Sequence, residues 1–141
     1  MTTIVYRAGV LAADSLCRVG DWNAPYAVEK LFRMKDGSVC GVCGNYTEAI
    51  AFIAWLNEGK KKDARPPLAG STVVQATAVG VIVHESEGCY PVKGDFGAWG
   101  SGLPVALGAL HMGATAEEAV KVASLVDEGT GGAIVSMKAK Q

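Results

Sequence analysis

Residues 2–14, TTIVYRAGVLAAD, contain two short β-prone runs, Thr2–Tyr6 and Val10–Ala13. The residues between them, Arg7-Ala8-Gly9, are typical of a tight connection, so the pattern predicts a β-hairpin. Because this hairpin begins at residue 2, we expect the start of the chain to lie inside a sheet. Asp14 follows directly at the end of the second run.

After this hairpin, the sequence predicts a loop over residues 15–27, which contain Gly20, Asp21, Asn23 and Pro25. Further strands are predicted at Val28–Met34, Ser38–Cys43, Thr72–His84, Cys89–Val92, Phe96–Trp99 and Gly131–Lys138. Helical periodicity predicts helices from Thr47 to Gly59, over Leu103–Met112, and from a capping box at Thr115 to about Asp127 with Ala119, Val122, Ala123 and Val126 on its apolar face. Strands grouped into hairpins favour antiparallel sheets with helices packed outside over a doubly wound parallel sheet.

The length of 141 residues predicts a single domain, residues 1–141. Half of the residues are hydrophobic and the formal net charge is −1, so no global field attracts nucleic acid or an anionic membrane. No apolar run approaches the roughly 18 residues of a membrane-spanning helix, and a signal peptide is absent, which predicts a cytoplasmic protein. The basic and proline-containing stretch Lys60–Gly70 is predicted to be a flexible, solvated connector.

Three other patterns favour structural roles over chemistry. His84 and His111 have no metal-site or triad context, and Cys40 and Cys43 lie three apart in one predicted strand, where side chains point to opposite faces. The four cysteines are therefore expected to be reduced, as in other cytoplasmic proteins. The glycine-rich segment at residues 129–132 lacks the lysine of a phosphate-binding loop. We expect neither a metal nor a cofactor.

The beginning of the chain resembles a known family. The segments Thr2-Thr3-Ile4-Val5 and Gly9–Asp14 are similar to the mature start of HslV-type peptidases and proteasome β subunits, which are N-terminal nucleophile (Ntn) hydrolases. By this resemblance the family's catalytic aspartate falls on Asp14, its lysine on Lys30 and its oxyanion glycine on Gly44.

Two later motifs extend the resemblance to the other end of the chain. Gly100-Ser101-Gly102 is similar to the family's serine element at the start of a helix. Residues 127–132 resemble its element of aspartate, hydroxyl and double glycine, with Asp127 as the aspartate and Thr130 where serine is usual.

The resemblance implies an α+β fold, a four-layer αββα Ntn-hydrolase sandwich of antiparallel sheets. One helical layer is expected to be reduced, because the region between Gly59 and Thr72 lacks the second helix of that layer. The first hairpin is also shorter than is usual in the family.

The resemblance also implies a chemistry. A threonine hydroxyl becomes a useful nucleophile when a base takes its proton, and a free α-amine, with a reference pKa of about 7.7–8.0, can do so. Thr2 would supply both groups once Met1 is removed, and a small second residue is the type that methionine aminopeptidase exposes. Lys30, held by Asp14, would favour the base form of the amine.

The remaining residues have implied supporting roles. The Gly44 N–H would stabilise the oxyanion, and Ser101, Asp127 and Thr130 would orient the Thr2 amine. The positions that shape the pocket for the residue before the cut are mostly apolar, which predicts a preference for apolar residues there: Cys17, Val28, Phe32, Val42, Tyr46 and Ile50.

The leading hypothesis is a threonine-type peptidase or amidase that acts on peptides or proteins as a homo-oligomer, with an ATPase unfoldase as a possible partner. A rival hypothesis is a catalytically silent scaffold or binding protein with the proteasome fold. A third is a small-molecule amidase or acylase, since the Ntn superfamily includes such enzymes. A retained Met1 would favour the rival, because the Thr2 nitrogen would then be an amide and not a base.

Overall fold

The computed structural model describes residues 2–59 and 65–140. The strands are β1 (Thr3–Arg7), β2 (Val10–Ala13), β3 (Leu16–Val19), β4 (Trp22–Ala27), β5 (Leu31–Arg33), β6 (Val39–Gly44), β7 (Ser71–Thr77), β8 (Gly80–Glu85), β9 (Gly88–Val92), β10 (Phe96–Gly100) and β11 (Val135–Lys138). The helices are α1 (Tyr46–Asn57), α2 (Leu103–His111) and α3 (Ala116–Val126).

The predicted N-terminal hairpin is confirmed. Strands β1 and β2 pair antiparallel with Tyr6 opposite Leu11, and the turn residues Ala8 and Gly9 both have positive φ, as tight hairpin turns require. This hairpin forms the centre of a four-stranded sheet with the order β10-β1-β2-β11. A five-stranded sheet has the order β5-β6-β7-β8-β9, and every strand pairing in both sheets is antiparallel. The predicted α+β class with antiparallel sheets is therefore correct.

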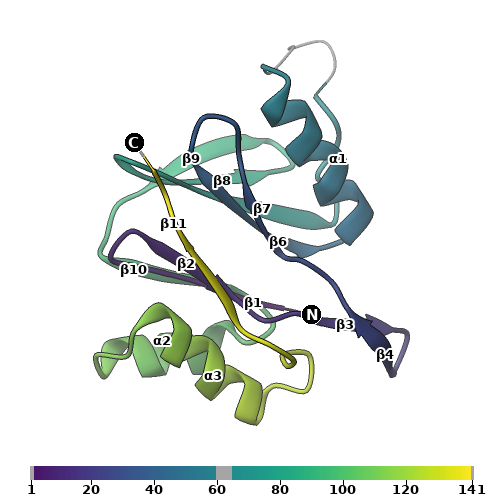
Figure 1. The fold of residues 1–141 in the computed structure, drawn as a ribbon, viewed down its shortest axis with the longest axis vertical. Helices are drawn as coiled ribbons and strands as arrows, with labels where there is room; N and C mark the ends of the chain where they lie inside the picture. Colours follow the sequence, from purple (N-terminus) through teal and green to yellow (C-terminus); the bar gives the residue numbers. More distant parts are fainter. Residues whose placement is uncertain (1, 60–64, 141) are drawn as a thin grey trace.

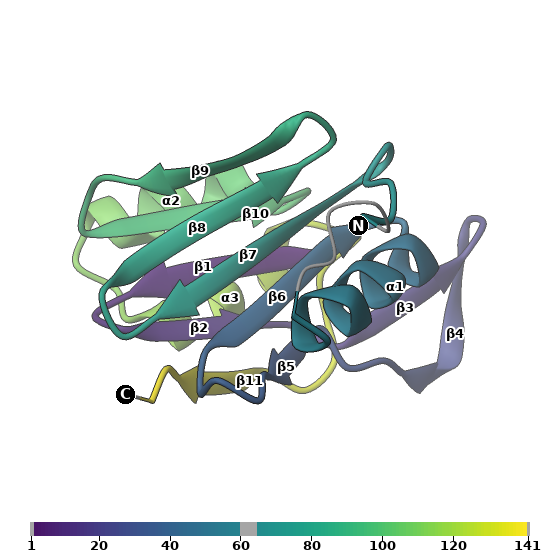
Figure 2. The same cartoon turned by 90° about the horizontal axis from the view of Figure 1, so that it is seen from above.

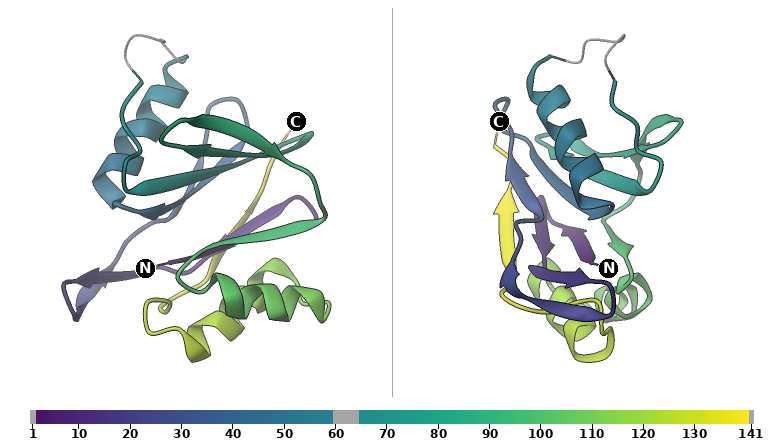
Figure 3. Two further views of the ribbon diagram at one scale, coloured as in Figure 1. Left: turned by 180° about the vertical axis from the view of Figure 1, so that it is seen from behind. Right: turned by 90° about the vertical axis from the view of Figure 1, so that its right-hand side faces the viewer.

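The two sheets face each other across a hydrophobic core, and the helices cover their outer faces (Figure 1). Ile4 and Leu11 from the four-stranded sheet meet Val39, Val74 and Val81 from the five-stranded sheet in this core. Helix α1 packs on the outer face of β6 and β7, and α2 and α3 pack on β10, β1 and β2 (Figure 3). The start of the chain thus lies in the sheet that carries α2 and α3.

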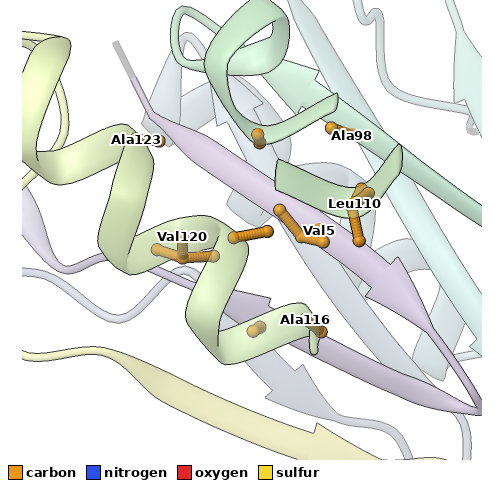
Figure 4. Close-up of a cluster of buried hydrophobic side chains, with 9 residues drawn as sticks. Val5, Ala98, Leu110, Ala116, Val120 and Ala123 are labelled. Carbon is orange, nitrogen blue, oxygen red and sulfur yellow. The ribbon is translucent and has the colours of Figure 1, made fainter. Parts of the chain in front are cut away.

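Small side chains let α2 and α3 approach β1 closely. Val5 of β1 is fully buried between Leu110 of α2 and Val120 of α3 (Figure 4). Alanines fill the rest of this cluster, and the buried positions of α3 recur every three or four residues: Ala116, Ala119, Val120 and Ala123. Each buried valine or leucine side chain contributes about 1.5–3 kcal/mol.

Residues 15–27 are not the predicted loop. They form the β3–β4 hairpin, a separate two-stranded sheet that projects from the body of the molecule (Figure 2). Gly20 and Asp21 are its turn, and Trp22 and Tyr26 are exposed. Because this hairpin buries little of either face, its sequence lacks the alternation of apolar and polar residues that marks a strand.

The predicted strand Thr72–His84 is two strands, β7 and β8. The chain reverses at Ala78 and Val79, where Thr77 Oγ1 donates to the Gly80 carbonyl and accepts from the Val79 N–H. These two turn residues are themselves apolar, so the β-prone run continues through the reversal, and the glycine at position 80 is the only turn residue in it.

Several predicted boundaries were also too wide. Val28 donates its N–H to the Ser15 carbonyl, so β5 begins only at Leu31. Residues 131–134 precede β11, because Gly131 binds Asp14 and Ser15 instead of a strand neighbour.

The predicted apolar face of α3 was partly wrong. Val122 and Val126 are exposed, whereas Ala116 and Val120 are buried. The capping box between Thr115 and Glu118 is confirmed.

The predicted connector Lys60–Gly70 lies outside the described residues over 60–64. Residues 65–70 are described and are not simply solvated. Leu68 is buried in the core under α1, and the Arg65 guanidinium lies 5.0 Å from the centre of the Phe52 ring. Within the described residues, no helix combines the length and apolar character that crossing a membrane requires.

Candidate active site

Residue 2 lies against the turn between β10 and α2. The Thr2 carbonyl accepts the Gly102 N–H at 3.4 Å, and the Thr2 N–H donates to Ser101 Oγ at 3.1 Å. A Cβ on Gly100 would lie 2.0 Å from the Thr2 carbonyl oxygen, and one on Gly102 would lie 1.9 Å from Thr3 Oγ1. Glycine on both sides of Ser101 therefore permits the close approach that holds residue 2 in place.

Asp14 and Lys30 form a buried ion pair beside this turn. Lys30 Nζ lies 3.0 Å from both carboxylate oxygens of Asp14, and the two side chains are 4% and 0% exposed. The carboxylate also accepts the N–H groups of Thr3 at 3.1 Å, Gly131 at 3.0 Å and Leu16 at 3.3 Å. Burial lowers the pKa of the Lys30 ammonium below its usual value, although the charge and hydrogen bonds of Asp14 oppose this shift.

A second carboxylate, Asp127, receives two hydroxyl protons. Ser101 Oγ and Thr130 Oγ1 each donate to Asp127 Oδ2 at 2.6 Å. Burial acts to raise the pKa of Asp127, but the hydrogen bonds from Ser101 and Thr130 and from the Gly129 N–H together hold it below its usual value. Since the Ser101 proton is directed to Asp127, its oxygen is left to accept the Thr2 N–H.

Two cavities meet at Thr2 and Gly44. The smaller has a volume of about 220 Å³ and is lined by Thr2, Leu16, Cys17, Arg18, Gly20, Val28, Lys30, Val42, Cys43, Gly44 and Tyr46. The larger has a volume of about 510 Å³ and is lined by Thr2, Cys43, Gly44, Leu68, Ala69, Gly70, Ser71, Thr72, Glu85, Ser86, Gly100 and Ser101. Thr2, Lys30 and Gly44 therefore all line the smaller cavity, and Thr2, Cys43 and Gly44 line both.

Gly44 ends β6 in a conformation that favours glycine. Its φ is +93°, and a Cβ there would lie 2.2 Å from the Gly70 carbonyl oxygen. The next residue, Asn45, donates its N–H to that same carbonyl at 2.9 Å and then caps α1 by accepting the Glu48 N–H. The strand-to-helix turn thus places Gly44 at the junction of the two cavities.

Four of the six predicted pocket residues line the smaller cavity, namely Cys17, Val28, Val42 and Tyr46. Phe32 and Ile50 do not. Phe32 packs instead against the core cluster under α1, and Ile50 is a half-buried residue of that helix.

Sequence reasoning missed several residues of the site. Leu16, Arg18 and Gly20 line the smaller cavity because residues 15–27 form a hairpin and not a loop. Arg18 adds a cation to a wall that was expected to be apolar. Its guanidinium donates to the carbonyls of Glu128 and Asp21.

Of the other side chains considered for chemistry, only Cys43 lines the two cavities; Cys40, His84 and His111 line neither. Cys40 belongs to the core under α1 and Cys43 to the core between the sheets, which confirms that they point to opposite faces of β6. His84 bonds Gln75 and packs on Phe52, and His111 packs edge-on against Phe96. The described part of the chain contains no cluster of three or more metal-binding side chains.

Comparisons with known proteins support the fold. No protein-family model matches the chain, and no curated protein matches it in sequence. Among solved structures, HslV from Trypanosoma brucei is 16% identical, with a TM-score of 0.73 over 96% of this chain and 97% of that one. Thiobacillus denitrificans BPH is 22% identical, with a TM-score of 0.69 over 99% and 98% of the two chains.

The same BPH in complex with epoxomicin gives a TM-score of 0.68 at 20% identity, over 99% of both chains. Each structure is matched over nearly its whole length, so the likeness covers every layer of the molecule. The chain therefore has the fold of HslV and BPH, as its resemblance to the HslV and proteasome β family predicts.

Proposed function

We propose that this chain is a threonine-type peptidase or amidase whose nucleophile is Thr2, exposed by removal of Met1. One observation carries the proposal. Thr2 lines both cavities, its nitrogen donates to Ser101, which is bonded to Asp127, and Lys30, paired with Asp14, lines the smaller cavity together with Thr2. We further propose that the packing of α1 on one sheet and of α2 and α3 on the other is the four-layer αββα arrangement, with one helical layer reduced to α1.

The reaction uses the free amine of Thr2 as the base. The amine takes the proton of the Thr2 hydroxyl while the hydroxyl oxygen attacks the carbonyl carbon of the scissile amide. The Gly44 N–H stabilises the negative charge that develops on the carbonyl oxygen. The ammonium then returns the proton to the leaving nitrogen as the C–N bond breaks, and water hydrolyses the resulting ester by the same route.

Lys30 and Ser101 act on the amine in two different ways. The Lys30 charge disfavours protonation of the nearby amine and so keeps more of it in the base form at neutral pH. Ser101 accepts an N–H from the amine nitrogen, which turns the nitrogen lone pair toward the hydroxyl. Lys30 therefore acts on the amine through its charge, and Ser101 acts by orienting the nitrogen.

The two cavities accommodate different parts of a substrate. The smaller cavity receives the side chain before the cut, against Val28, Val42 and Tyr46. The larger cavity, bordered by Gly70, Ser71, Gly100 and Ser101, receives the rest of the substrate.

Intact mass spectrometry tests the proposal. Protein made in its native host is expected to lack Met1, and incubation with epoxomicin, the compound in the BPH complex, is expected to add its mass to the wild type and to Thr2→Ser but not to Thr2→Ala. The residue at position 2 is small in all three proteins, so Met1 removal is the same in each and the comparison isolates the hydroxyl. Retention of Met1 together with the absence of an adduct would favour a scaffold role instead. Turnover of short peptidyl amides against acylated metabolites then separates a peptidase from a small-molecule amidase.

A further inference from the structure

Thr3 is fully buried and joins the two carboxylate systems of the site. Its N–H donates to Asp14 Oδ1 at 3.1 Å, and its Oγ1 lies 2.7 Å from Thr130 Oγ1. Thr3 belongs to the lining of neither cavity. A side chain in this position has no access to substrate and can act only through its neighbours.

The direction of the Thr3 hydrogen bond follows from the protons available. Thr130 has one hydroxyl proton, and the 2.6 Å bond to Asp127 uses it. The Thr130 oxygen is therefore the acceptor in its contact with Thr3, and Thr3 is the donor. A continuous series runs from the Thr3 hydroxyl through Thr130 to Asp127, where it meets the series from the Thr2 nitrogen through Ser101.

We infer that Thr3 is a positioning residue of the proposed reaction, with its hydroxyl fixing Thr130 and Asp127 and its N–H fixing residue 2 against Asp14. A hydroxyl that accepts a hydrogen bond is a stronger donor, so Thr3 strengthens the bond from Thr130 to Asp127. The inference rests on the proposed function for its effect on rate.

The space around the hydroxyl supports this role. A Cβ on Gly102 would lie 1.9 Å from Thr3 Oγ1 and 3.1 Å from Thr130 Oγ1, so the glycine leaves room for the contact between the two hydroxyls. A valine at position 3 would place a methyl group in that space, whereas serine and alanine fit without a clash.

Thr3→Ser and Thr3→Ala differ by a single hydroxyl and form the test. In the full chain without Met1, Thr3→Ser is expected to keep the wild-type kcat. Thr3→Ala is expected to lower kcat about five- to tenfold with KM unchanged, the effect of one net hydrogen bond. The control pair is Thr77→Ser and Thr77→Ala, which changes hydrogen bonds in the β7–β8 turn and is expected to leave kcat unchanged.

A second readout does not depend on turnover. NMR titration of the Asp127 carboxyl carbon is expected to give the same pKa in the wild type and Thr3→Ser and a raised pKa in Thr3→Ala. An unchanged Asp127 titration in Thr3→Ala overturns the inference, as does a loss of rate that Thr3→Ser does not rescue. If the wild type forms no epoxomicin adduct and the Asp127 titration still responds, the proposed function fails while the positioning of Asp127 by Thr3 stands.

Discussion

Asp14 and Lys30 contribute unequally to stability, although they form one ion pair. Asp14→Ala leaves a buried ammonium without its counter-charge and removes the acceptor for three backbone N–H groups. Lys30→Met leaves a carboxylate that still accepts those three N–H groups. Breaking a buried pair costs about 3–5 kcal/mol, and we expect Asp14→Ala to reach this range and Lys30→Met to fall below it.

Urea denaturation at pH 7 measures both variants. The double variant Asp14→Ala/Lys30→Met serves as the control, because it removes the stranded charge and is expected to be more stable than Asp14→Ala alone. Equal losses in the two single variants would show that the backbone N–H groups add nothing to the role of Asp14.

Protonation of Asp127 makes the stability of the fold depend on pH. Its pKa in the folded chain is lowered from 3.8, so the unfolded chain binds more protons between the folded value and 3.8. The stabilisation is therefore present above 3.8 and is lost as the pH falls through the folded pKa. Chemical denaturation from pH 6 to pH 2 is expected to show a steeper loss of unfolding free energy in the wild type than in Asp127→Asn.

An exposed carboxylate provides the comparison for that titration. Asp95 lies between β9 and β10 on the surface, and Asp95→Asn is expected to keep the steep acid dependence of the wild type. If Asp127→Asn also keeps it, Asp127 is not the group responsible.

At the scale of elements, the entry into α2 is fixed by glycine. Gly102→Ala would place a Cβ 1.9 Å from Thr3 Oγ1 and 3.0 Å from the Ala123 side chain. We expect this variant to lose about 1–3 kcal/mol of unfolding free energy through overpacking and to displace residue 2, with a corresponding loss of activity.

Gly108→Ala is the matched control within the same helix. A Cβ at Gly108 meets no atom within 4 Å, and alanine is the better helix former by about 1 kcal/mol. Thermal denaturation is expected to show a higher Tm for Gly108→Ala and a lower one for Gly102→Ala. A stable, active Gly102→Ala would contradict the close packing of α2 against the start of β1.

Sequence signals predicted best the elements that are defined by residues close together in the chain. The capping box of α3 and the hairpin of β1 and β2 were correct because each depends on residues within one turn or one strand pair. The β3–β4 hairpin was missed because it exposes most of both faces and so shows no alternation. The reversal between β7 and β8 was missed because Ala78 and Val79 carry no turn signal.

At the scale of the whole molecule, apolar side chains remain exposed on the outer face of α3. Leu125 and Val126 are 77% and 66% exposed, and Val122 is also exposed. We propose that contacts between copies of this chain cover this face, in line with the expected homo-oligomer. Light scattering after size exclusion is expected to give an oligomeric mass for the wild type and a lower mass for Leu125→Glu.

Val79→Glu is the control for this measurement. Val79 is 98% exposed at the β7–β8 turn, so the variant adds the same charge at a site away from α3 and is expected to keep the wild-type mass. A monomeric wild type, or an equal mass for Leu125→Glu, would contradict the proposed contact.

The sequence by itself determined the hairpin at residues 2–14, the antiparallel α+β class and the identity of the candidate chemical groups. These depend on local pairing and on residue types that a motif preserves. Only the tertiary structure decided which groups meet, because Asp14, Lys30, Ser101 and Thr130 come from separate segments that the packed sheets and helices bring together. It also decided that Thr3 joins the two carboxylates and that Arg18 lines the pocket, since burial and long-range contact have no local signature.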